Sequence, residues 1–281
     1  FGQQDYAKAR KYSKLYIENG KKGLGLHQIA YMCFDMEALI CAQQKDRHAA
    51  FAALDSMKYG LTLSAGVCKE NVMHYHDVKG RVHAMFEEWD KACNEYKKAL
   101  DAVEDTHASY RADYFRIVNL LGTALFHCKR YDDARNYFAD FTHYCRLQFG
   151  DKSLAFADAL WTMANLEGYS GNTDAGKQYY IKSVDICKHL VADNLRYISV
   201  QDRNAFWISF APKMWAMTAY AMKIGERQSV FTEKCYEALL FSKALLLESD
   251  RTMAAAINEK CSPEEKRVYY EMLGLQSQLK E

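Results

Sequence analysis

The chain has 281 residues and a nearly balanced charge, with 37 Lys and Arg against 36 Asp and Glu. Hydrophobic residues make up 49% of it, which excludes an intrinsically disordered chain, and a net charge of +1 gives no electrostatic footprint for nucleic acid or for a polybasic membrane patch. Only 2 Pro and 14 Gly occur, and because these residues punctuate loops and β-rich folds, their scarcity indicates helices joined by short turns.

Residues 1–20 predict one helix. The stretch DYAKARKYSKLY reads as the second helix of a hairpin whose first helix is missing, so we expect a partial repeat there. The first residue is Phe1 and not Met, which we interpret as a processed or truncated product, with a removed signal peptide left open. The glycine-containing segment Glu18–Gln28 follows a helix and has no Lys before Ser or Thr, so it predicts an inter-repeat turn and not a phosphate-binding loop.

A spacing of 42 residues then recurs along the chain. Two small positions and one bulky position keep this period, at Ala38, Gly80, Gly122 and Ala164, at Ala50, Ala92, Ala134 and Gly176, and at Leu54, Tyr96, Phe138 and Tyr180. A fixed period of this length is typical of repeat architectures. The sequence therefore predicts a repeat array over residues 1–190, with units at about 25–60, 68–104, 108–149 and 152–190 after the partial repeat at 1–20.

Each unit predicts two antiparallel helices. In the third unit, apolar residues at i, i+3, i+4 and i+7 mark one helix face from Val118 to Leu125 and another from Tyr131 onwards. The short link HCKRYDD makes the two helices antiparallel neighbours. Because Gly122 and Ala134 lack bulk, the two backbones can approach closely, and we expect Phe138 to fill the space beside them.

The period fades after about Leu190, so residues 191–281 predict a divergent repeat followed by long helices that pack on the array. Pro212 is expected to kink or end a helix. Ser262, Pro263 and Glu265 predict the capped start of the last helix. The side chains expected on its inner side are those of Tyr269, Tyr270, Leu273 and Leu279.

The repeat units resemble tetratricopeptide repeats. The stretches LLGTALFHCKRYDDARNYF, TMANLEGYSGNTDAGKQYY and GRVHAMFEEWDKACNEY carry the small residues and aromatics of that family at its offsets, and the resemblance covers roughly Asp5 to Lys188. The usual unit of the family has about 34 residues, so a 42-residue period resembles the longer variant of kinesin light chains and many bacterial regulators. The resemblance implies an all-α fold, a right-handed superhelix of helical hairpins, whose first helices line a concave groove.

Reading the groove-facing positions of the first helices by period gives a candidate site for a protein or peptide ligand. Its residues are Asp77, Arg81, Arg116, Asn119, Thr123, Phe126, Asp158, Trp161 and Asn165. Asn119 and Asn165 suit hydrogen bonds to a peptide backbone, and Arg81 or Arg116 suits a carboxylate. The alternative is that these are ordinary solvated polar residues. If the site is correct, replacing Arg81, Arg116 and Trp161 by Ala weakens binding and leaves thermal stability nearly intact.

The C-terminal third carries a second resemblance. The stretches SVQDRNAFW, CYEALLFSKALLLESDRTMAAAI and YYEMLGLQSQLKE look like the helical segment that precedes the caspase-like cysteine protease domain of bacterial CHAT proteins. The residues that carry it best are Leu240, Lys243, Leu245, Leu246, Leu247 and Ser249, with Ala244 where that family usually has Gly. The resemblance implies a regulatory or substrate-recruiting scaffold, with the protease domain expected after Glu281. The alternative is a free-standing adaptor that assembles a complex or self-associates.

No catalytic, metal or cofactor site is predicted. The nine cysteines are dispersed and form no C-x-x-C pair, which favours buried thiols in a reducing, cytoplasmic compartment. In HYHDVKGRVH, His74 and His76 point apart on a helix, and His76 and His83 lie about 10 Å apart along its axis. One zinc ion is therefore not expected to bind both, and these residues are interpreted as solvent or groove histidines. We expect no nucleic-acid or membrane partner.

Overall fold

The computed structural model describes residues 3–23, 26–63, 69–103, 111–194 and 200–278. Within these ranges the regular elements are α-helices, and no strand occurs, which confirms the all-α fold class. The chain divides into two compact units, residues 1–148 and 149–281. This division falls between the third and fourth hairpins of the array, and the boundary that the sequence predicts near residue 190 stays a prediction. Each unit is described by itself below.

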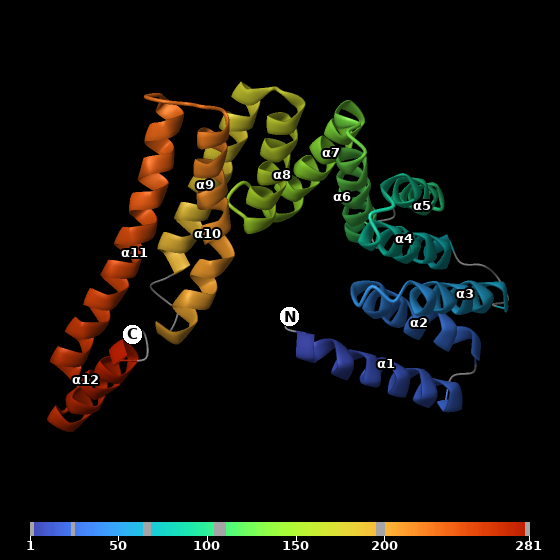
Figure 1. Ribbon diagram of the computed structural model, residues 1–281, viewed down its shortest axis with the longest axis horizontal. Helices are drawn as coiled ribbons and strands as arrows, with labels where there is room; N and C mark the ends of the chain where they lie inside the picture. Colours follow the sequence, from blue (N-terminus) through green and yellow to red (C-terminus); the bar gives the residue numbers. More distant parts are fainter. Residues whose placement is uncertain (1–2, 24–25, 64–68, 104–110, 195–199, 279–281) are drawn as a thin grey trace. The chain divides into compact units, whose positions relative to one another are not determined.

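The first unit consists of one helix and three hairpins (Figure 1). Its helices are α1 (Gln3–Gly23), α2 (Leu26–Gln43), α3 (Arg47–Leu63), α4 (Lys69–Met85), α5 (Trp89–Asp101), α6 (Arg111–His127) and α7 (Tyr131–Phe149). The pairs α2–α3, α4–α5 and α6–α7 correspond to the predicted units. Helix α1 extends to Gly23, so the turn expected over Glu18–Gln28 is shorter than predicted, and its residues 24–25 lie outside the described ranges.

All small and bulky positions of the 42-residue period are buried. Their contacts repeat as well. A methyl group added to Gly122 would lie 2.7 Å from ring carbons of Phe138, and one added to Gly80 would lie 2.6 Å from the ring of Tyr96. Such distances are too short for carbon atoms, so a larger residue at these two crossings would force the facing ring to shift. The expected packing of Phe138 against Gly122 is confirmed.

The turns inside the hairpins also keep the period. Lys45, Glu87 and Lys129 have φ values of 61°, 61° and 60°, and Gly171 has a φ of 89°. These residues end the first helix of each hairpin in the left-handed region, which is a common helix C-terminus. The three non-glycine residues each adopt a conformation that glycine would adopt without steric cost. The backbone therefore repeats more faithfully than the residue types do.

The second unit begins with the fourth hairpin, α8 (Leu154–Ser170) and α9 (Thr173–Asn194). Helices α10 (Val200–Lys223), α11 (Val230–Lys260) and α12 (Pro263–Gln278) follow. Tyr220 on α10 packs against the hairpin, because a methyl group on Gly168 would meet its ring at 2.7 Å and one on Gly176 would meet its hydroxyl at 3.2 Å. Helix α10 therefore continues the packing of the array beyond its fourth hairpin.

The structure describes Pro212 in α10 and the start of α12. Of the two expectations for Pro212, a kink or a helix end, the helix end does not occur, because α10 runs through Pro212. Pro212 is exposed, and water can therefore solvate the carbonyl group that the missing amide leaves unpaired. The capped start of α12 is confirmed, since the Ser262 amide donates to Glu265 and the Glu265 amide to the Ser262 hydroxyl.

The expected inner side of α12 is only partly described. Tyr270 is 49% exposed, and its hydroxyl lies 3.2 Å from the side-chain oxygen of Asn258. The placement of Tyr270 on a buried face is therefore wrong. Leu279 and the side chain of Leu273 lie outside the described residues.

Candidate functional site

The candidate residues lie on the first helices of three hairpins. Helix α4 carries Asp77 and Arg81, helix α6 carries the four from Arg116 to Phe126, and helix α8 carries Asp158, Trp161 and Asn165. The residues of α4 and α6 belong to the first unit and those of α8 to the second. Within the first unit, the structure brings Asp77 and Arg116 into direct contact.

Ion pairs join successive first helices of the first unit. His74 on α4 lies 3.1 Å from Asp35 on α2, and Arg116 on α6 lies 3.0 Å from Asp77 on α4. The members of each pair are 39 residues apart. This spacing is about one helical turn shorter than the 42-residue period. In each pair, the residue on the later helix therefore lies one turn before the position equivalent to its partner. Much of the polar character that predicts a groove therefore serves to connect neighbouring repeats.

The Asp77–Arg116 ion pair joins α4 and α6 through a buried carboxylate. Asp77 is 1% exposed, and two guanidinium nitrogens of Arg116 reach its two carboxylate oxygens at 3.1 and 3.0 Å. Asp113 holds the same guanidinium from the solvent side, at 3.3 Å. Burial opposes the charge of Arg116, but the hydrogen bond and the charge of Asp77 outweigh it and raise the pKa of the guanidinium. Asp77 is thus enclosed by the protein and positions Arg116.

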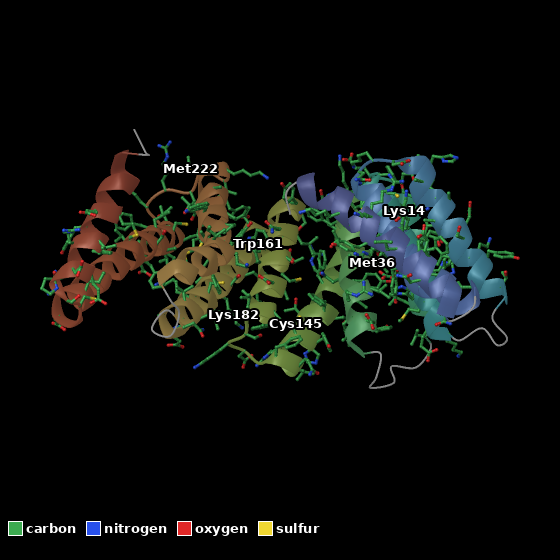
Figure 2. All side chains as sticks on the ribbon, turned by 90° about the horizontal axis from the view of Figure 1, so that it is seen from below. Lys14, Met36, Cys145, Trp161, Lys182 and Met222 are labelled. Atoms are coloured by element: carbon green, nitrogen blue, oxygen red, sulfur yellow. The ribbon has the colours of Figure 1, made fainter. Side chains whose placement is uncertain are left out.

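In the second unit, a residue that sequence reasoning missed occupies the same face. Lys213 of α10 places its Nζ 2.6 Å from Asp158 and 5.7 Å from the centre of the Trp161 ring. Its side chain is only 10% exposed. Lys213 follows the point at which the 42-residue period fades, so the period gave no signal for it. Its contacts show that α10 covers part of α8, near the labelled Trp161 in Figure 2.

Three further candidate side chains also have contacts inside the protein. The Tyr180 hydroxyl donates to the Asn165 side-chain oxygen at 2.6 Å, so Asn165 connects the two helices of the fourth hairpin. The Thr123 hydroxyl donates to the backbone carbonyl of Asn119 at 2.9 Å. The ring of Phe126 lies 5.7 Å from that of Tyr131, across the turn of the third hairpin.

Few polar groups of the candidate site have no ion pair or hydrogen bond within the described residues. Arg81 has no ion pair within the described part of the chain, although its neighbour Arg116 has two. The side-chain oxygen of Asn119 and the indole nitrogen of Trp161 are buried without a hydrogen-bond partner among the described residues. A buried polar atom without a partner costs about 1–3 kcal/mol. Arg81 and Asn119 lie on the consecutive first helices α4 and α6 of one unit.

The three histidines of α4 each face a different carboxylate. His74 contacts Asp35, His76 lies 2.7 Å from Glu95, and His83 lies 2.7 Å from Glu88. The sequence interprets them as solvent or groove histidines, and in the structure each takes part in a contact with a carboxylate. No group of His, Cys, Asp and Glu suited to a metal ion occurs within the described ranges.

The contacts of Glu95 predict an acid-sensitive fold. Burial disfavours the Glu95 carboxylate, but His76, Lys98 and Lys79 outweigh this effect and lower its pKa from 4.5 to about 2. Since the folded pKa is below the unfolded one, the stabilisation is complete above pH 4.5 and is lost as the pH falls towards 2. It amounts to about 3 kcal/mol. Urea denaturation at pH 6, 4 and 3 should therefore show a decline, and Glu95→Gln should be less stable at pH 6 with a shallower decline. An equally steep decline in that variant would contradict the assignment.

Several cysteines behave as small buried residues. Burial raises the pKa of the thiols of Cys41, Cys187 and Cys235 to about 11. These thiols are therefore protonated at neutral pH. None of the helices in the described ranges has the length and apolarity needed to cross a membrane.

Comparison with known proteins supports the fold. The crystal structure of BtubC (BKLC) from P. vanneervenii is similar with a TM-score of 0.60 at 12% sequence identity, over 92% of this chain and 94% of that chain. No protein-family model and no curated protein matches the sequence. At this identity the likeness shows the fold alone. The chain therefore has an all-α fold of repeated helical hairpins.

Proposed function

We propose that the chain is a non-catalytic scaffold that binds a protein or peptide segment along the first helices α4 and α6. The observation that carries this proposal is the contrast within one face. Asp77 and Arg116 are paired with each other, whereas Arg81 has no ion pair within the described residues and the Asn119 side-chain oxygen has no partner there. Arg81 suits a carboxylate, and Asn119 suits a backbone amide of an extended segment.

Replacing Arg81 by Ala should weaken peptide binding at least about tenfold, because the ligand loses a charge-assisted hydrogen bond. The probe is an acidic peptide selected from a display library against the intact chain, titrated by calorimetry. Arg130→Ala is the matched control, since Arg130 is an exposed arginine that pairs with Asp133. Unchanged affinity in Arg81→Ala, with the melting temperature also unchanged, would exclude this face. Arg116 and Trp161 are not useful in this test, because both have contacts within the protein.

A finer proposal concerns the role of this scaffold. The residue pattern of α11, which resembles the segment before the protease domain of bacterial CHAT proteins, supports a cytoplasmic regulatory or substrate-recruiting part of such a protease. The stretch Leu240–Ser249 lies within the single helix α11, and its side chains from residue 243 onwards are outside the described residues. Sequencing the gene beyond Glu281 tests the proposal. An α/β domain with a Cys and a His would support it, and a stop codon would reject it.

A specific surface favours the alternative of a self-associating adaptor. Ile208, Pro212, Trp215, Ala219 and Met222 follow each other on α10 with alternating steps of four and three residues. All five are exposed, with Ile208 at 66%, Trp215 at 57% and Met222 at 78%. This spacing is that of a coiled-coil seam. Large residues alternate with small ones symmetrically about Trp215, so an antiparallel second copy could place its Trp215 ring beside Pro212 or Ala219.

If this surface joins two copies, the intact chain should form a dimer at high concentration, and Trp215→Lys should abolish it. Light scattering over a range of concentrations measures the mass directly. Met36→Lys is the matched control, because Met36 is likewise an exposed apolar residue, 55% accessible, on another helix (Figure 2). A monomer at all concentrations would reject self-association through α10.

A further inference from the structure

Two cysteines of different hairpins meet at the junction of the second and third repeats. Cys93 lies on α5, and Cys128 directly follows α6. At the same junction, the rings of Trp89 and His127 stack with centres 3.9 Å apart. The Cys128 thiol also donates to a carboxylate oxygen of Asp90 at 3.5 Å.

Helix geometry brings the two thiols near each other. Asp90, which the Cys128 thiol contacts, precedes Cys93 by three residues on α5, so Asp90 and Cys93 share one face of that helix. Each thiol affects the pKa of the other, and both cysteines are free thiols in this structure. Cys93 is 5% exposed, whereas Cys128 is partly exposed. Cys128 is therefore the sulfur that a reagent in solution can reach, and Cys93 is the sulfur that can react with it next.

We propose that Cys93 and Cys128 form a reversible disulfide with a low-molecular-weight disulfide, such as glutathione disulfide, as the oxidant. The Cys128 thiolate attacks one sulfur of the oxidant, whose sulfur–sulfur bond breaks and releases one glutathione. The Cys93 thiolate then attacks the Cys128 sulfur and releases the second glutathione. The two cysteine protons end on the two glutathione thiols, so the protein loses two electrons and the oxidant gains them.

The surroundings of the pair set the conditions for this reaction. Burial raises the pKa of both thiols, and together with Cys93 and Asp90 it brings the pKa of Cys128 to about 12. Little thiolate is therefore present at neutral pH, and the pair stays reduced unless the oxidant persists. The reaction rate should rise with pH. Removing the negative charge of Asp90 should lower the pKa of Cys128 and accelerate the reaction.

The cross-link would connect neighbouring hairpins. Repeats in such arrays contact mainly their neighbours, so a covalent bond between α5 and the turn after α6 restricts how the second hairpin moves against the third. Those hairpins carry Arg81 and Asn119. The disulfide itself does not depend on the proposed binding function, and its test below uses no ligand.

The test treats the intact, folded chain with glutathione disulfide and measures its mass, followed by peptide mapping without reduction. We expect the loss of two hydrogens, mapped to a Cys93–Cys128 link, reversal by dithiothreitol, and a rise in melting temperature of about 5–10 °C. Cys93→Ser should instead retain one bound glutathione at Cys128. Cys187→Ser, which changes a buried cysteine elsewhere, should still form the link.

The Asp90→Asn variant should form the disulfide several-fold faster than the unchanged protein at the same pH. Accidental proximity of the two thiols would not produce this difference in rate. Glutathione bound at Cys128 without closure in the unchanged protein would overturn the proposal. Links among other cysteines, or formation of this link only after denaturation, would overturn it as well.

Discussion

Replacing Arg116 by Ala should lower the free energy of unfolding by about 3 kcal/mol. The change leaves the Asp77 carboxylate, which is 1% exposed, without its ion-pair partner. Breaking a buried ion pair from one side costs about 3–5 kcal/mol, because the remaining charge is desolvated and uncompensated. The lower end applies here, since the Arg116 side chain is 41% exposed and water can enter when it is removed. Urea denaturation of the variant at neutral pH measures the loss.

Two further variants separate this effect from a general loss of charge. Arg130→Ala removes an arginine that pairs with Asp133 on the surface, where both side chains are about half exposed, and it should change stability little. Adding Asp77→Asn to Arg116→Ala removes the stranded charge, so the double variant should be more stable than Arg116→Ala alone. If Arg116→Ala is as stable as Arg130→Ala, the pair between α4 and α6 does not contribute as we infer.

This result would also correct the sequence-based interpretation of the same residue. The period places Arg116 among groove residues whose replacement leaves stability intact, whereas the structure makes it half of a contact between repeats. The pattern of one helix face did not reveal that Asp77 is the partner of Arg116, because such a pattern describes one repeat at a time. Asp77 and Arg116 are 39 residues apart, and comparison of adjacent first helices at that spacing would have found them.

Other parts of the structure follow directly from the sequence. The small and bulky positions every 42 residues place the hairpins and their crossings, because a close approach of two helices requires a small residue at a fixed place. The sequence did not predict the left-handed turns, because among the four turn residues only Gly171 has the residue type that predicts this conformation. Beyond residue 190 the period fades, and Lys213 then reaches α8 through tertiary packing that no local pattern encodes.

Replacing Phe138 by Ala should have the largest effect, a loss of about 3–5 kcal/mol in the free energy of unfolding. Phe138 is 3% exposed, and its ring fills the space that Gly122 leaves at the crossing of α6 and α7. Truncation would leave a cavity between the two helices, and the packed side chains around the crossing would keep the helices from closing it. Chemical denaturation followed by circular dichroism measures the change, and Leu147→Ala is the control, because Leu147 is an apolar residue of the same helix that is 66% exposed.

The crossing can also be tested from its other side. Gly122→Ala places a methyl group 2.7 Å from the Phe138 ring and should destabilise the protein by about 1–2 kcal/mol, even though alanine favours a helix more than glycine does. In the Phe138→Ala background the same methyl group enters the vacated space, so Gly122→Ala should there be neutral or stabilising. This reversal of sign is expected only if the two side chains compete for one volume. Equal effects in both backgrounds would mean that the side chains at positions 122 and 138 do not compete for one space.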